Sequence, residues 1–192
     1  LIHIDFLIEF FRLAKAKGIH MSLDTCGQPF TKDEPFYSRF DELMKYTDLV
    51  LMDIKHINSD FHRKYTGHPN ESILNMARDL SERGIPMWVR HVLVPERSDF
   101  DEDLKKLSAF IDSLDSVAKV EVLPYHKLGV YKYEQLGIPY RLEGIESPSK
   151  ERVENANKIL KTDQYKTSKH ENTKTQQQKD LAINVSFCKM QN

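Results

Sequence analysis

The sequence predicts an α/β fold in which parallel strands form one sheet with helices on its outer side. Helical periodicity alternates with short runs of β-forming residues four times between residues 1 and 160. These runs are continuously apolar, which is typical of parallel strands buried on both faces. Four such units amount to about half of a (β/α) barrel, which typically has about 250 residues. Because the chain also begins at Leu1, we expect it to be the C-terminal portion of such a barrel.

The first half of the chain contains two helix–strand units. Residues 5–17 have apolar side chains at helical spacing, and Gly18 follows them, a residue type that tolerates the left-handed conformation at a helix end. A strand is expected at 20–23. The second unit is a helix over 37–46 followed by a fully buried strand over 48–54.

The second half repeats this order. Asn70 is expected to cap a helix that ends at Gly84, and a strand follows over 87–94. Ser98, with Asp101 three residues later, resembles a capping box that opens the next helix. The remaining expected elements are a strand over 119–123 and a last helix that begins at Ser147-Pro148 and runs through Ile159.

The predicted globular domain covers residues 1–162, and residues 163–192 form a polar tail. No aliphatic residue lies between Leu160 and Leu181, so this stretch cannot bury enough apolar surface to offset the entropy of ordering it. We expect the tail to be disordered or unrelated to the domain, and its apolar end, 181–187, to have no partner.

Composition excludes several classes of protein. Lys and Arg number 28 and Asp and Glu 29, and the resulting net charge of -1 argues against a nucleic-acid-binding protein. No apolar run approaches the roughly 20 residues that cross a bilayer, so no membrane partner is expected. Two cysteines, Cys26 and Cys188, make no disulfide framework, which predicts a cytoplasmic protein.

Polar side chains gather where the predicted strands end. Asp24 follows the first strand, Asp53 and Lys55 follow the second, Arg90 lies in the third and His126 follows the fourth. The carboxyl ends of parallel strands share one edge of the sheet, and ligands bind at that edge. We call this edge the rim, and we expect a ligand site there that combines two carboxylates with three cationic side chains.

Each of these residues also has a purely structural interpretation. Asp24 could form a turn, Lys55 could be solvated and His126 could be a structural histidine. Arg90 is harder to explain in this way, because a charge inside an apolar strand needs a partner. A separate set of histidines, spaced six residues apart, matches no zinc-ligand pattern and is expected on the surface: His56, His62 and His68.

Around these residues the sequence resembles a known family. The segments LDTCG (23–27), MDIK (52–55), WVRHVLVP (88–95), LPYH (123–126) and LGIPY (136–140) resemble, in order and spacing, segments of pyruvate formate-lyase activating enzymes. These are radical S-adenosylmethionine (SAM) proteins, and the resemblance covers residues 1 to about 161.

The resemblance implies a partial (β/α)6 barrel and an oxidoreductase of anaerobic metabolism. A [4Fe-4S] cluster reduces SAM, and the resulting 5′-deoxyadenosyl radical takes a hydrogen atom from a glycine of the partner, pyruvate formate-lyase or a related enzyme. The electron comes from a donor such as flavodoxin or ferredoxin. The site residues that the resemblance implies are Asp24, Thr25, Asp53 and the Met52 carbonyl for a monovalent cation, and Lys55, Arg90 and His126 for SAM.

The chain also departs from the family. Neither the cluster motif CxxxCxxC nor the Gly-Gly-Glu segment that binds the SAM amine occurs in the 192 residues, and Cys26 is not a cluster ligand in the matching position. No catalytic residue and no iron–sulfur ligand is therefore expected here. We expect the chain alone to be inactive and to bind SAM weakly at best.

Three alternatives remain open at this point. The chain could belong to an activase of another glycyl-radical enzyme. It could be a non-catalytic module that docks on the lyase through an aromatic-rich loop over 125–140. It could also be an aldolase-type barrel with Lys55 as a Schiff-base lysine, although the nearby Asp53 disfavours the neutral amine that this chemistry needs.

Overall fold

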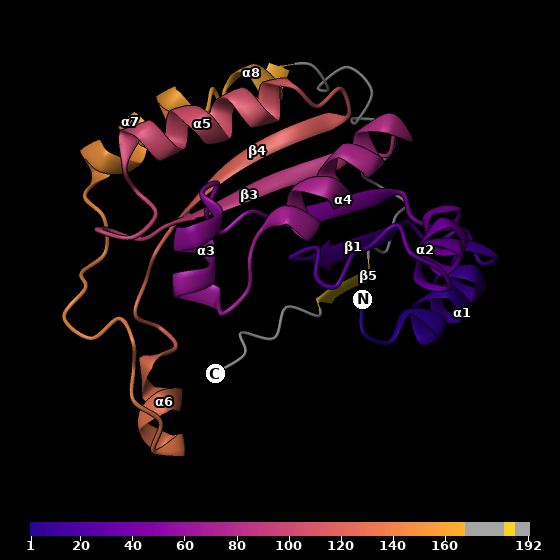
Figure 1. Cartoon of the computed structure of the whole chain (residues 1–192), viewed down its shortest axis with the longest axis horizontal. Coiled ribbons are helices and arrows are strands. Elements are labelled where there is room, and N and C mark those ends of the chain that lie inside the picture. Colours follow the sequence, from indigo (N-terminus) through magenta and orange to yellow (C-terminus); the bar gives the residue numbers. More distant parts are fainter. Residues whose placement is uncertain (168–182, 187–192) are drawn as a thin grey trace.

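The computed structural model describes residues 1–167 and 183–186, and strands and helices alternate in it as expected (Figure 1). The sheet has the strand order β4-β3-β2-β1-β5, with every neighbouring pair parallel. Strands β1 to β4 are neighbours in chain order, as in a barrel opened along one side. The predicted α/β fold is confirmed. The strands are β1 (Met21–Thr25), β2 (Leu49–Asp53), β3 (Met87–Leu93), β4 (Val117–Pro124) and β5 (Ile183–Ser186).

Five of the helices lie where the sequence predicts them, with ends that differ by a few residues. The others, α3, α6 and α8, were not predicted. α3 is mostly polar, and it is fixed by its ends: the Asn58 side chain accepts hydrogen bonds from two backbone N–H groups, and Gly67 ends it with φ 85°. The helices are α1 (Ile4–Lys15), α2 (Phe36–Met44), α3 (Ser59–Thr66), α4 (Glu71–Glu82), α5 (Asp101–Asp112), α6 (Val130–Leu136), α7 (Lys150–Ile159) and α8 (Gln164–Thr167).

The expected helix caps differ in detail. The Asn70 side chain makes no cap bond to α4, and the Ser98 side chain lies before the N-cap of α5, which is Phe100. Both side chains bind the backbone of other segments instead. α7 begins later than predicted, with the Ser149 hydroxyl accepting from the Arg152 N–H.

The core lies between the sheet and the helices, and it distinguishes the two faces of β3. Met87, Val89 and Leu93 are fully buried in one apolar cluster with α4 and α5, and His91 is buried on the same side. Arg90 and its alternate neighbours are only partly buried. Strand β3 therefore shows alternating rather than continuous burial, and its second face is open enough to carry a site.

The residues after 162 that the structure describes include one strand, β5. Residues 183–186 pair in parallel with β1, with Ile183 beside Met21 and Ser186 beside Asp24. The apolar end of the tail was expected to have no partner, and this expectation was wrong for residues 183–186. An edge strand such as β1 has unpaired backbone N–H and C=O groups, and a β-forming segment can pair with them. The boundary at 162 and the character of the rest of the tail remain predictions, and residues 168–182 and 187–192 lie outside the described part.

Helix α6 stands apart from the sheet at the end of an extended connection from β4 (Figure 1). It has no buried residue, and Leu128, Tyr131 and Leu136 are exposed on or beside it. The aromatic-rich segment expected as a loop is thus partly helical. None of the helices in the described residues is long and apolar enough to cross a bilayer.

Candidate functional site

The guanidinium group of Arg90, on β3, joins side chains from β2 and β1 at the rim. Arg90 lies beside Asp53 in the β2–β3 register, and its Nε donates to Asp53 Oδ1 at 2.7 Å. Its Nη1 donates to Asp24 Oδ2 at 3.1 Å, and Nη2 binds the other oxygen of the same carboxylate. Arg90, which was predicted to need a partner, therefore has two: Asp53 on β2 and Asp24 on β1.

Lys55 extends this group of charges. Its Nζ donates to Asp53 Oδ2 at 2.7 Å, so both oxygens of Asp53 accept from cationic side chains. We call Asp24, Asp53, Lys55 and Arg90 the rim network. The structure brings together four of the five residues that the sequence placed at the rim, and the paired Lys55 gives no support to a neutral Schiff-base lysine.

The network is partly dehydrated and strongly coupled. The side chains of Arg90, Asp24 and Asp53 are 16%, 14% and 11% exposed. Burial alone lowers the pKa of Arg90, but the hydrogen bonds and charges of Asp24 and Asp53 raise that pKa overall. Arg90 therefore stays charged, and charge-assisted bonds of this kind are among the stronger ones in proteins.

Thr25 and Met52 lie beside each other, one step from the network. They are register partners in the β1–β2 pair, and both are buried. The Thr25 hydroxyl accepts a hydrogen bond from the Gly27 N–H at 3.0 Å. In the described residues no group of three or more His, Cys, Asp or Glu side chains gathers as for a metal ion. The predicted cation site has only two such side chains, Asp24 and Asp53, together with a hydroxyl and a carbonyl, and it remains a prediction.

His126 is the predicted site residue that the structure does not bring to the others. It follows the end of β4 and is exposed, and none of the network bonds includes it. Its neighbour Tyr125 is buried, with its hydroxyl 2.6 Å from that of Tyr140. A role of His126 in a ligand site remains a prediction.

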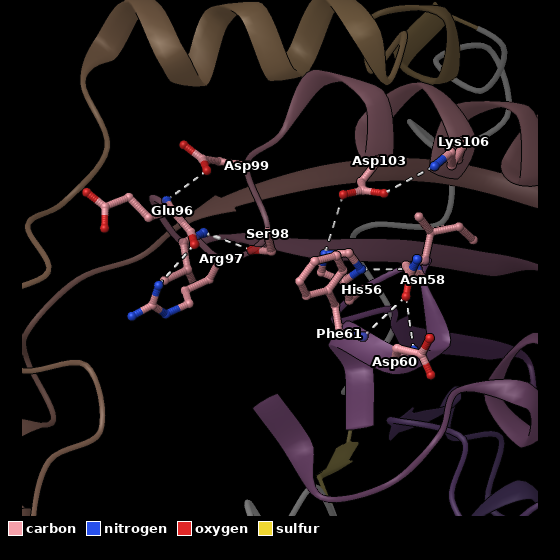
Figure 2. Close-up of polar contacts among 12 residues, drawn as sticks. His56, Asn58, Asp60, Phe61, Glu96, Arg97, Ser98, Asp99, Asp103 and Lys106 are labelled. Atoms are coloured by element: carbon pink, nitrogen blue, oxygen red, sulfur yellow. Dashed lines mark hydrogen bonds and ion pairs between the residues drawn. The ribbon is translucent and has the colours of Figure 1, made fainter. Parts of the chain in front are cut away.

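A layer of buried polar side chains lies beneath the rim, and sequence reasoning missed it. His56 and His62, expected on the surface, are each 2% exposed, whereas His68 is exposed as expected. His56 Nδ1 accepts from the Asn58 N–H at 3.0 Å, and its Nε2 lies 3.8 Å from the Asp103 carboxylate of α5 (Figure 2). These histidines were misplaced because Nδ1 of each ring binds a backbone group, the Asn58 N–H for His56 and the His68 carbonyl for His62, and a sequence pattern does not reveal such contacts. Nε2 of each ring is buried without a hydrogen-bond partner.

His91 on β3 is buried as well, and burial lowers the pKa of His56, His62 and His91. For His56, desolvation outweighs the opposing effect of the Asp103 carboxylate. For His62, desolvation outweighs the hydrogen bond to the His68 carbonyl, and for the fully buried His91 it outweighs two backbone carbonyls. The three rings are therefore neutral at pH 7.

Two surface cavities of the described chain lie away from the rim network. One, of about 320 Å³, lies between the β3–α5 loop and the start of α7 and includes Glu96 and Arg152. The other, of about 540 Å³, lies beside α4 and includes Lys32 and Arg78. Neither contains a network residue, so the site is identified by its charges rather than by a hollow.

Comparison with known proteins identifies the family of the chain. The family model described as the radical SAM superfamily matches residues 1–108. The chain is 51% identical over 166 residues to the pyruvate formate-lyase-activating enzyme of Listeria monocytogenes, covering 86% of this chain and 67% of the relative. It is 49% identical over 168 residues to the enzyme of that name from Streptococcus mutans, covering 88% and 64%. The chain thus spans about two thirds of the length of these curated relatives.

The fold is shared with a solved structure as well. A domain of pyruvate-formate lyase-activating enzyme from Bacteroides vulgatus aligns with a TM-score of 0.68 at 24% identity, over 96% of this chain and 92% of that domain. The structure of SuiB from Streptococcus suis aligns with a TM-score of 0.59 at 12% identity, over 94% of this chain and 36% of that one. This chain belongs to the radical SAM superfamily and, within it, to the pyruvate formate-lyase-activating enzymes.

Proposed function

We propose that the chain supplies the carboxylate-binding part of the SAM site in an enzyme that generates a glycyl radical on pyruvate formate-lyase. The names of the relatives support the lyase as partner. The observation that carries the proposal is the placement of Lys55 and Arg90 side by side on the rim, joined through Asp53. A flavodoxin or ferredoxin donor and a cytoplasmic location belong to the same proposal.

The donor set of the rim fits SAM. Lys55 has three N–H donors and uses one on Asp53, and its side chain is 28% exposed. Arg90 has five donors and uses three on the two aspartates. The remaining donors suit the SAM carboxylate, and SAM when bound is the source of the superfamily's radical chemistry. In the same proposal Asp24, Thr25, Asp53 and the Met52 carbonyl hold a monovalent cation, and His126 approaches SAM from the β4 end.

The residues present do not fit an iron–sulfur cluster. The superfamily implies one, but the chain has two cysteines, Cys26 on the rim side of β1 and Cys188 outside the described residues. Fewer than three thiolates cannot hold a [4Fe-4S] cluster. No step of the reaction is therefore assigned to residues of this chain.

Titration of the chain with SAM, followed by NMR, tests the proposal. We expect shifts at Lys55, Asp53 and Arg90 with a Kd of about 1 mM, which corresponds to about −4 kcal/mol. Lys55→Met is expected to weaken binding by a factor of about ten or more, because a charged hydrogen bond to a carboxylate is worth about 1.5–3 kcal/mol.

Lys119→Met is the matched control. Lys119, like Lys55, is a half-buried lysine that pairs with a carboxylate two residues away; it lies on β4 and pairs with Glu121 of the same strand. It should leave the SAM affinity unchanged. If neither the wild-type chain nor either variant shows SAM-dependent shifts at the rim, or if both variants lose affinity equally, the proposal is wrong.

A further inference from the structure

The segment that carries Lys55 has no regular structure of its own. Residues 54–57 follow β2 and precede α3, and the β2–β3 backbone ladder reaches them only through the bond from the Ile54 N–H to the Arg90 carbonyl at 3.0 Å. The segment nonetheless fixes where the Lys55 ammonium points. Something other than a strand or a helix must hold it.

Buried side chains from two other elements hold this segment by its carbonyl oxygens. The Asn70 amide, 2% exposed, donates to the His56 carbonyl at 3.0 Å and to the Ile57 carbonyl at 2.7 Å. His91 Nδ1 contacts the Ile54 carbonyl at 2.9 Å. The carbonyls on both sides of Lys55 are thus engaged by side chains that the core holds in place.

His91 lies on the opposite face of β3 from its neighbour Arg90. Its second ring nitrogen, Nε2, contacts the carbonyl of Ser98 at 2.8 Å. Ser98 in turn is fixed, because its hydroxyl donates to the Val92 carbonyl at 2.7 Å and accepts from the Val94 N–H at 3.0 Å. The ring therefore connects the Lys55 segment with the loop before α5.

The two ring contacts of His91 compete for one proton. A carbonyl oxygen only accepts, so each contact is a hydrogen bond only when its own nitrogen carries hydrogen. A neutral imidazole carries one. The contact at Nδ1 holds the Ile54 carbonyl next to Lys55, and the contact at Nε2 holds the Ser98 carbonyl in the loop before α5. A substitution that keeps one contact and removes the other can therefore show which of them matters for Lys55.

We infer that His91 and Asn70 are positioning residues of the SAM site. His91, donating from Nδ1, and Asn70, donating from its amide, clamp the backbone of residues 54–57 and so present Lys55, beside Asp53, to the carboxylate of the ligand. This inference rests on the proposed function. Neither residue touches the ligand itself, since both lie buried on the core side of the rim.

A pair of substitutions at His91 separates positioning from folding. Asparagine places its amide nitrogen where histidine has Nδ1, so His91→Asn keeps the donor to Ile54 and removes the contact with Ser98. Glutamine places its amide nitrogen near the position of Nε2, so His91→Gln keeps a contact with Ser98 and removes the donor to Ile54. Each variant loses the ring and one of its two carbonyl contacts, and we expect similar losses of stability.

Their SAM affinities are expected to differ. In the NMR titration, H91N should bind SAM within about twofold of the wild type, and H91Q about tenfold more weakly, in proportion to one lost positioning bond. Asn70→Ala should also bind about tenfold more weakly, and it provides the test if H91Q does not fold. Amide hydrogen exchange at Ile54 and Asn58, whose N–H groups bond to the Arg90 carbonyl and to His56 Nδ1, should accelerate in H91Q and N70A but not in H91N.

Thr47→Val controls for a general loss of stability. The buried Thr47 hydroxyl donates to the Leu43 carbonyl at 2.9 Å at the end of α2, away from the rim. This variant should lose stability without losing SAM affinity. Equal affinities of H91N and H91Q, or of N70A and the wild type, would overturn the inference alone. A wild-type chain with no SAM-dependent shift would overturn the proposed function and the inference together.

Discussion

Replacing Arg90 with methionine is expected to lower the free energy of unfolding by about 3–5 kcal/mol, the usual cost of removing one partner of a buried charge pair. The substitution leaves Asp24 without the guanidinium that binds both its oxygens and leaves Asp53 with Lys55 alone. Two mostly buried carboxylates, on the neighbouring strands β1 and β2, then repel each other. Urea unfolding at pH 7 measures the loss.

Two further variants give this result its meaning. Arg90→Lys retains the charge but not the planar fork that reaches both aspartates, so we expect a loss between those of wild type and R90M. Arg12→Met removes an exposed ion pair with Glu9 on α1, and because water screens such a pair its loss is expected to change the stability very little. A loss in R90M no larger than in R12M would show that the rim network contributes nothing to stability.

Lowering the pH from 7 to 5 is expected to destabilise the protein by several kcal/mol. The pKa values of His56, His62 and His91 are lowered in the folded chain, chiefly by burial. In the unfolded chain these rings take up protons near pH 6.5. The unfolded state then binds more protons than the folded state, so stability is full above about pH 6.5 and falls below it, by at most about 1.4 kcal/mol per pH unit for each histidine.

Urea unfolding at a series of pH values between 7.5 and 5 measures this slope. Most carboxylates remain ionised across the window, so the histidines dominate the change. His62→Gln should reduce the slope by about one proton, because His62 lies in α3, apart from the pair formed by His56 and Asp103. A stability that does not change between pH 7 and pH 5 would contradict the burial of these rings.

The rim network could be predicted from the sequence because each member follows or interrupts an apolar run. Asp53 and Arg90 are charged positions in strands that are otherwise apolar except for His91, and parallel strands place such positions at one edge. What the sequence did not show is which oxygen each cation binds. That depends on the β2–β3 register, which sets Asp53 beside Arg90.

The supporting layer could not be predicted, for a different physical reason. Asn70 and His91 bind carbonyl oxygens of a segment that lies far away in the chain, and backbone acceptors leave no trace in a sequence. Asn70 was assigned to a helix cap because it precedes an amphipathic run, but its amide is used elsewhere. His126 shows the opposite case: its position after β4 predicted a site residue, yet the exposed connection to α6 does not hold its side chain against the network.

Strand β5 has a consequence for the order in which the molecule assembles. Strands β1 to β4 can pair through connections of a few dozen residues each, whereas β5 must return to β1 across about 160 residues. Closing that loop costs about 1.6 kcal/mol more in chain entropy than closing the connection between β1 and β2. We expect β5 to join the sheet last during folding and to leave it first during unfolding, so that the early folding intermediate exposes the edge of the strand that carries Asp24.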